Sequence, residues 1–291
     1  MTRILLTGIH GQVGWELQRT LQPLGEVVAF DRSQLDLAKP EQIRSVMQSL
    51  KPTIIVNPAA YTAVDKAESE PELAQIINGT APAILAEEAK HLDALLLHYS
   101  TDYVFDGEKT TPYVESDATH PIGSYGRTKL AGEEAITATA CRHLIFRTCW
   151  VYGHRGHNFM RTMLRLAAER DELRVVDDQF GAPTWSRMIA ETTALALARH
   201  AGQQGIYHLA ATGECSWHGF AESIIQQANA FGILTKCPSV HGITSADFPT
   251  PTRRPASSRL DCTRLAQDFG LRLPSWQSQL TSCLAEFAPS R

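Results

Sequence analysis

Paired cysteines are missing from this sequence. Its six cysteines are scattered along 291 residues, and no two of them form a C-x-x-C pair. This pattern argues against a disulfide framework and against a cysteine-based zinc site. We therefore expect the thiols to be reduced and mostly structural.

Long apolar runs and a strong excess of one charge are also missing. No run approaches the roughly 18 apolar residues of a membrane-spanning helix, and no basic-then-apolar leader precedes the first predicted strand. The formal net charge of −4 offers no electrostatic case for binding nucleic acid or an anionic membrane surface. We expect a cytoplasmic protein.

A glycine-rich stretch near the start organises the rest of the chain. Apolar residues 3–6 predict a buried strand, and the sequence T-G-I-H-G-Q-V-G follows at residues 7–14. Gly8 permits a tight turn, Gly11 lets the main chain approach a pyrophosphate, and Gly14 lets a helix pack closely on the strand. The spacing differs from the usual G-x-G-x-x-G, so an ordinary turn stays an alternative.

An acidic residue ends the second predicted strand. Residues 26–30 form that strand, and Asp31 follows Gly14 at close to the roughly 20-residue offset where an acid binds the adenosine ribose. An acid there favours NAD, because it would repel a 2′-phosphate. Arg32 beside it would tolerate that phosphate, so NADH and NADPH both stay open.

Strands and helices alternate through the first hundred residues. This alternation is typical of an α/β fold with a doubly wound parallel sheet of the Rossmann type, and 43% hydrophobic residues supply a substantial core. The expected strands lie at 3–6, 26–30, 53–57 and 94–101. Residues 71–92 predict a long helix that is interrupted near Gly79 and Pro82, and residues 143–152 predict a further strand.

The alternation becomes irregular beyond Gly153. We therefore expect a dinucleotide-binding domain over residues 1–153, to which residues 184–212 return with a helix and a strand. The remaining residues, 154–183 and 213–291, are expected to form a smaller C-terminal α+β lobe that binds the substrate.

Polar residues at the end of the fourth strand and on the next helix predict the reacting groups. Tyr125 and Lys129 are four residues apart on one predicted helix, so their side chains share a face. A nearby ammonium stabilises a phenolate and lowers the pKa of the phenol, which suits acid–base catalysis. Thr101 would orient a carbonyl for protonation. The same Tyr–Lys spacing also occurs by chance on exposed amphipathic helices.

Six motifs together resemble the extended short-chain dehydrogenase/reductase family, in particular the branch that reduces dTDP-linked keto sugars. The resemblance runs from residue 7 to about residue 260, and the extended branch uses the same unusual glycine spacing. The motifs are T-G-x-x-G-Q-V-G at 7–14, N-P-A-A-Y-T-A-V-D at 57–65, S-T-D-Y-V-F-D-G at 100–107, Y-G-x-x-K at 125–129, R-x-x-W-V-Y-G at 147–153 and R-R-P at 253–255.

The resemblance implies an NAD(P)H-dependent oxidoreductase. It would reduce the C4 ketone of dTDP-4-dehydro-β-L-rhamnose to dTDP-β-L-rhamnose for surface polysaccharides. Tyr125 would donate the proton, Lys129 would hold the nicotinamide ribose, and Thr101 would contact the sugar. The other implied cofactor-binding residues are Gly8, Gly11, Gln12, Val13, Gly14, Asp31, Asp36, Leu37, Ala60, Tyr61 and Thr62. The other implied substrate-binding residues are Asp102, Tyr103, Trp150, Arg253 and Arg254.

Several of these residues also fit purely structural roles. Asp36 would equally precede and cap a helix, and Trp150 would equally belong to the core. Arg253 and Arg254 would clamp a diphosphate bidentately, but arginines next to proline are often simply solvated.

Related enzymes on the same scaffold define the competing functions. A sugar-nucleotide 4,6-dehydratase needs a carboxylic acid after the Thr–Asp pair, where this chain has Tyr103. A 4-epimerase keeps its cofactor bound without net turnover. A non-catalytic NADP-binding regulatory subunit, such as that of methionine adenosyltransferase, would not need Thr101, Tyr125 and Lys129 together.

The resemblance also implies a homodimer, in some members with Mg²⁺ at the subunit interface. Glu16 and Glu191 are the candidate ligands for that ion. Neither a nucleic acid nor a membrane is expected as a partner.

Overall fold

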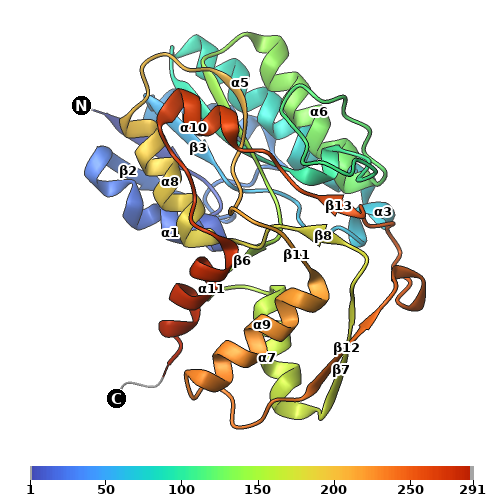
Figure 1. The fold of residues 1–291 in the computed structure, drawn as a ribbon. Coiled ribbons are helices and arrows are strands. Elements are labelled where there is room, and N and C mark those ends of the chain that lie inside the picture. Colours follow the sequence, from blue (N-terminus) through green and yellow to red (C-terminus); the bar gives the residue numbers. More distant parts are fainter. Residues whose placement is uncertain (1, 289–291) are drawn as a thin grey trace.

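A six-stranded sheet forms the centre of the larger part of the molecule in the computed structural model, which describes residues 2–288 (Figure 1). Every neighbouring pair of strands in it is parallel, and the strand order is β10-β5-β4-β3-β1-β2. The strands are β1 (Arg3–Leu6), β2 (Glu26–Ala29), β3 (Ile54–Asn57), β4 (Leu95–Thr101), β5 (His143–Thr148) and β10 (Gly205–His208).

Helices cover both faces of this sheet. Successive side chains along a strand point to opposite faces, so each strand contributes apolar residues to both faces. Ile4 and Leu6 pack with Leu17 of α1 on one face, whereas Leu5 packs with Ile43 of α2 on the other. The doubly wound, Rossmann-like sheet predicted from the sequence is confirmed. The first face carries α1 (Gln12–Thr20), α8 (Ser186–Ala198) and α10 (Thr263–Phe269), and the second carries α2 (Pro40–Leu50), α5 (Ala81–His91) and α6 (Ser124–Thr139).

The helix predicted over residues 71–92 is interrupted where the sequence indicates. A π-helical turn, Ile76–Thr80, joins α4 (Pro71–Gln75) to α5. Asn78 of this turn accepts the Tyr61 N–H at 2.8 Å and donates to the Tyr61 carbonyl at 3.1 Å. The wider turn therefore anchors the loop that follows β3.

The strand predicted over residues 143–152 is wrong in its second half. β5 ends at Thr148, and Trp150 has a φ of 48°, in the left-handed region that bulky side chains rarely adopt. The chain turns there and continues as β6 (Val151–Tyr152), which pairs with β9 (Thr184–Trp185). Cys149 and Tyr152 belong to the core of the smaller lobe, so the turn at Trp150 takes the chain out of the sheet.

The smaller lobe has its own core, which includes Trp185, Phe220 and Trp276. In Figure 1 the pair β7–β12 lies at the far end of this lobe, and β8 lies on the side of the lobe nearer the sheet. The return of α8 and β10 to the sheet fits a discontinuous first domain, whose boundaries stay a prediction. The lobe's elements are α7 (Phe159–Glu169), α9 (Trp217–Ala230), α11 (Trp276–Ala285), β7 (Glu172–Val176), β8 (Phe180–Gly181), β11 (Cys215–Ser216), β12 (Ser239–Ile243) and β13 (Ser257–Ser258).

Across residues 2–288, no helix is long and apolar enough to cross a membrane. All six cysteines are free thiols. A short helix, α3 (Lys66–Ser69), lies between β3 and α4.

We expect Gly14→Ala to destabilise the fold. A Cβ on Gly14 would lie 2.2 Å from the carbonyl oxygen of Gly8, so α1 must move away from the turn that precedes it. Overpacking of this kind lowers the free energy of unfolding by about 1–3 kcal/mol. Urea denaturation followed by circular dichroism measures the change.

Gly219→Ala is the matched control, because a Cβ on this helical glycine would meet its nearest atom at 3.6 Å. It should be as stable as the unmodified protein or slightly more stable. If Gly14→Ala and Gly219→Ala had the same free energy of unfolding, the predicted effect of the close contact between α1 and the turn would be wrong.

Candidate active site

The carboxyl ends of β1 and β3 form the first part of the site. The direction of the strand order reverses between these two strands, and ligands of open α/β sheets bind at such a switch point. Gly8 follows β1 with a φ of 61°, and a Cβ on it would lie 2.9 Å from the Cα of Ala59, which follows β3. The two main chains are therefore in contact, and a side chain at residue 8 does not fit.

The start of α1 is open to an anion. Gly11 donates its N–H to the Gly8 carbonyl at 2.9 Å and is the N-cap of α1, which has no side-chain cap. The N–H groups of the first helical turn, which begins with Gln12 and Val13, are therefore available to a phosphate. This backbone cradle fits the pyrophosphate of a dinucleotide.

Asp31 lies at the end of β2 as an ionised carboxylate. It accepts the Ser33 N–H at 2.8 Å and the Ser33 hydroxyl at 2.6 Å, and it lies 3.4 Å from the His10 ring. The Ser33 hydroxyl is the largest of the influences that hold the pKa of Asp31 below its usual value. A carboxylate at this strand end has the chemistry to accept ribose hydroxyls.

Asp36 and Leu37 shape the turn between β2 and α2. Asp36 accepts the Ala38 N–H at 3.0 Å and lies 3.6 Å from Arg32, and Leu37 is buried against the sheet. The N-cap of α2 is Lys39, so Asp36 stabilises the preceding turn without capping the helix.

Ala60, Tyr61 and Thr62 follow β3 on the loop that Asn78 anchors. The Tyr61 hydroxyl donates to Glu70 at 2.5 Å, and this hydrogen bond is the main cause of the raised pKa of Tyr61. The Tyr61 side chain therefore points toward Glu70, and the loop follows Ala59, whose main chain contacts Gly8.

The second part of the site lies at the end of β4. Thr101 is buried there, and its hydroxyl donates to Asp102 at 3.0 Å. Tyr103 packs edge-on against Tyr125 of α6, with 5.5 Å between ring centroids. Burial raises the pKa of Tyr125, and the Thr101 hydroxyl beside it opposes that rise in part. The phenol is protonated at neutral pH, as a proton donor must be.

Asp102 offers a free hydrogen-bond acceptor. It is 3% exposed, and its Oδ2 has no hydrogen-bond partner within residues 2–288. Burial raises the pKa of this carboxyl to about 6, so it is mostly ionised at neutral pH. A buried polar atom left without a partner is costly, and Oδ2 therefore fits a site for a hydroxyl-bearing ligand.

Lys129 is buried beside β4. Its Nζ donates to the Tyr99 carbonyl at 2.6 Å and lies 3.1 Å from Nε2 of His98. Burial lowers the pKa of Lys129 to about 8, and Glu133 partly offsets this effect. The predicted lowering of the Tyr125 pKa by Lys129 is not observed, because burial dominates at the phenol and the lysine is directed toward β4.

Trp150 lies on a wall of the smaller lobe. Its ring stacks on Trp217 with 3.5 Å between centroids and an angle of 9°, and a Cβ on Gly181 would lie 2.6 Å from it. It is only partly buried and packs against the lobe core. Trp150 therefore fits the predicted core role, and its side chain is not fully buried.

The two adjacent arginines lie in different surroundings. Arg254 donates to Asp65 at 2.7 Å and to the Tyr103 hydroxyl at 3.5 Å, which brings it to the end of β4. The Arg253 side chain is 75% exposed and lies 3.9 Å from the exposed Glu108. The structure thus brings Arg254 to the site and leaves Arg253 in solvent.

Sequence reasoning missed the contacts that His98, Asn78 and Trp217 make at the site. His98 was detectable, because it is an ionisable residue directly after the apolar run Leu95–Leu97 in β4. Asn78 and Trp217 carry no such signal, since each lies on a helical segment far along the chain from its partner.

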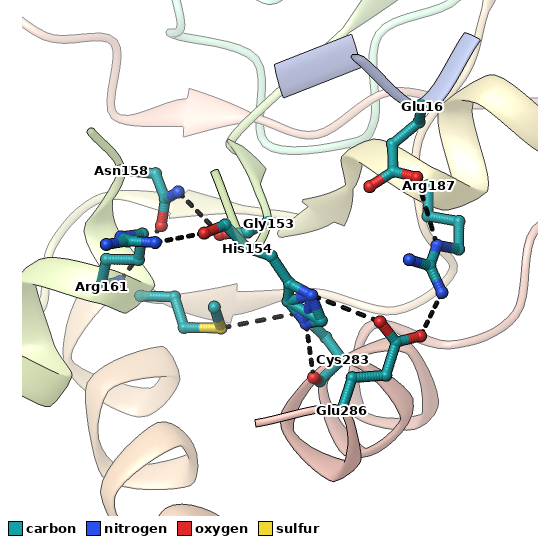
Figure 2. Close-up of polar contacts among 9 residues, drawn as sticks. Glu16, Gly153, His154, Asn158, Arg161, Arg187, Cys283 and Glu286 are labelled. Atoms are coloured by element: carbon teal, nitrogen blue, oxygen red, sulfur yellow. Dashed lines mark hydrogen bonds and ion pairs between the residues drawn. The ribbon is translucent and has the colours of Figure 1, made fainter. Parts of the chain in front are cut away.

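Glu16, one of the two proposed metal ligands, lies in a cluster of ion pairs (Figure 2). Arg187 donates to Glu16 at 3.3 Å and also pairs with Glu286, whose carboxylate lies 3.3 Å from the His154 ring. Burial raises the pKa of Glu191. The part of the chain that the structure describes holds no group of three or more His, Cys, Asp or Glu side chains suited to a metal ion, so Mg²⁺ gains no support.

The parallel sheet and the glycine turn define a Rossmann-like fold, and the similarity to solved and curated reductases makes the class an oxidoreductase of the short-chain dehydrogenase/reductase type. The chain belongs to the family of the RmlD substrate binding domain, which matches residues 1–288.

Relatives with a common name cover almost the whole chain. It is 47% identical to dTDP-4-dehydrorhamnose reductase of Burkholderia thailandensis over 98% of both chains. It is also 47% identical to dTDP-4-dehydrorhamnose reductase of Escherichia coli K12 over 97% of both chains.

Solved structures agree with this assignment. Bacillus anthracis dTDP-4-dehydrorhamnose reductase in complex with NADP has a TM-score of 0.91 and 36% identity, covering 98% of this chain and 100% of that one. Thermus thermophilus UDP-glucose 4-epimerase in complex with NAD has a TM-score of 0.84 and 18% identity over 100% of both chains, which shows the shared fold alone.

Proposed function

We propose that this protein reduces the C4 ketone of dTDP-4-dehydro-β-L-rhamnose to dTDP-β-L-rhamnose with NADH or NADPH. The observation that carries the proposal is 47% identity, over nearly the full chain, to two dTDP-4-dehydrorhamnose reductases. The NADP in the related Bacillus anthracis structure supports a nicotinamide cofactor. Synthesis of a surface polysaccharide is the corresponding cellular role.

The cofactor supplies a hydride to the carbonyl carbon when it is bound. In this proposal the start of α1 binds the pyrophosphate, because the glycine turn leaves its N–H groups uncovered. Asp31 accepts the adenosine ribose hydroxyls, and Lys129 holds the nicotinamide ribose. Arg32 and His10, which lie near Asp31, would also bind a 2′-phosphate, so both NADH and NADPH fit this end of the site.

Tyr125 donates the proton that the carbonyl oxygen takes up. Its raised pKa keeps the phenol protonated at neutral pH, and the Thr101 hydroxyl beside it orients the carbonyl. Asp102 accepts a sugar hydroxyl at its unpartnered Oδ2, and the partly buried Trp150 packs against the sugar. Arg254 is better placed than Arg253 to meet the diphosphate, since it lies beside Tyr103.

Two rival reactions fit less well. A dehydratase would need a carboxylic acid at Tyr103, and burial raises the pKa of this phenol to about 12, so it is a very weak acid. The epimerase among the similar structures is only 18% identical, which supports the fold and not the reaction. A non-catalytic subunit would not account for Thr101, Tyr125 and Lys129 at one strand end.

A homodimer stays a prediction from the family resemblance, and a cytoplasmic location stays a prediction from the sequence composition. Six free thiols fit a reducing compartment. Size-exclusion chromatography with light scattering measures the assembly state.

We expect the purified protein to oxidise NADH or NADPH only when a dTDP-4-keto-6-deoxy sugar is present. Loss of absorbance of the reduced nicotinamide measures turnover across a panel of nucleotide sugars with each cofactor. Binding of the cofactor without any such loss would contradict the reductase assignment, and product formation without loss of reduced cofactor would indicate an epimerase.

We expect Tyr125→Phe to lower kcat by on the order of 10²-fold or more, because the variant lacks the proton donor. The affinity for NAD(P)H, measured by fluorescence titration, should change little. Tyr103→Phe is the matched control, since it removes a buried phenol from the partner ring of the same edge-on pair. Near-native turnover of Tyr125→Phe, or an equal loss in Tyr103→Phe, would assign the proton donor elsewhere.

A further inference from the structure

Four buried polar side chains connect the glycine turn to α6. The Thr7 hydroxyl lies 2.6 Å from Oδ1 of Asn57, and Nδ2 of Asn57 lies 3.1 Å from Nδ1 of His98. Nε2 of His98 lies 3.1 Å from Nζ of Lys129, which also donates to the Tyr99 carbonyl. None of the four residues is more than 2% exposed. Water therefore does not reach these groups, and each hydrogen-bond donor among them must pair with an acceptor in the protein.

The balance depends on the charge of Lys129. An ammonium has no lone pair, so a charged Lys129 requires Nε2 of His98 to accept. A neutral imidazole then carries its hydrogen on Nδ1 and needs an oxygen acceptor. Asn57 supplies one when its amide oxygen faces the ring, and its amide nitrogen then donates to Thr7.

A neutral Lys129 requires the opposite arrangement. Its amine accepts a hydrogen from Nε2 of His98, and Nδ1 then accepts from the amide nitrogen of Asn57. In this structure the amide nitrogen of Asn57 faces His98 and its oxygen faces Thr7. This placement of the amide atoms is the one that a neutral lysine requires. Rotation of the amide by about 180° gives the one that a charged lysine requires, and the two states differ by one proton.

The surrounding charges place that proton on Lys129 and not on His98. Burial, followed by the charge of Lys129, holds the pKa of His98 well below its usual range, so the ring stays neutral. Glu133, one turn along α6, is already paired with Arg147 of β5 at 2.6 Å, and both are buried. The titratable groups on the adjoining elements are Tyr125 and Glu133 on α6, Tyr99 on β4, Asp102 and Tyr103 just after β4, and Arg147 on β5. Of these, Glu133 acts on the charge of Lys129.

We propose that His98 is a positioning residue whose tautomer, and with it the amide orientation of Asn57, follows the charge of Lys129. The ring presents an acceptor to the buried ammonium and thereby keeps the lysine charged over a wider pH range. The same switch reaches Thr7, which accepts the Ala59 N–H at 3.4 Å beside Gly8. The charge of Lys129 is thereby connected to the strand ends that hold the glycine turn.

Nitrogen NMR of the imidazole tests this directly. In protein labelled with ¹⁵N-histidine, we expect His98 to carry its hydrogen on Nδ1 near pH 6.5 and on Nε2 near pH 9, with a midpoint near 8, where Lys129 titrates. His98→Gln identifies the resonances by their loss. In Lys129→Met, the tautomer should not change with pH.

A single tautomer across that range in the unmodified protein, or an imidazolium at pH 6.5, would overturn the proposal. So would a tautomer change that persists in Lys129→Met. The measurement uses the protein without any sugar nucleotide, so it stays informative even if the reductase assignment fails.

Two substitutions at His98 separate positioning from mere packing. His98→Leu removes the acceptor, so the pH above which NAD(P)H affinity declines should fall by about one unit, as expected for loss of one charge-assisted hydrogen bond. His98→Gln keeps an acceptor near the Nε2 position and should restore the unmodified pH profile. An equal loss of affinity at every pH in both variants would indicate a structural role and contradict the proposal.

Discussion

The close contact of main chains at the switch between β1 and β3 is the constraint on which the rest of this structure depends. Gly8 lies against Ala59, and Gly14 lies against Gly8, so no side chain fits between these strand ends and α1. This contact leaves the start of α1 without a cap and open to a phosphate. It also brings Thr7 and Asn57 together, so the buried polar chain to Lys129 begins where the phosphate cradle does.

Burial also determines which ionisable groups near the end of β4 are charged at neutral pH. Desolvation disfavours the charged form of every group, so it raises the pKa of Tyr125 and Asp102 and lowers that of Lys129. The phenol consequently keeps its proton at neutral pH, while the lysine loses its own near pH 8. The ion pair between Glu133 and Arg147 is buried nearby without an unpaired charge, and Glu133 supports the ammonium form of Lys129.

The sequence predicted the elements that local patterns determine. The helix that carries Tyr125 and Lys129, the strand that ends at Thr101 and the three-glycine turn all follow from periodicity and spacing, and the structure contains them. The reversal at Trp150 was not predictable, because an apolar run continues through it and only the packing against Gly181 and Trp217 explains it. The partners of Lys129 were not predictable either, because Lys129 lies on α6 and its partners, His98 and Tyr99, lie on β4. Helical spacing suggested only Tyr125 as a partner of Lys129.

Deuterium transfer tests the central claim, which is that the cofactor delivers hydride to the sugar C4 at the site formed by β1, β3 and β4. The protein is incubated with NADPH carrying deuterium at the transferred C4 position and with dTDP-4-dehydro-β-L-rhamnose, and the product is examined by proton NMR and mass spectrometry. The account predicts one deuterium at the sugar C4 and none elsewhere. Product without deuterium at C4, or with deuterium at another carbon, would contradict it.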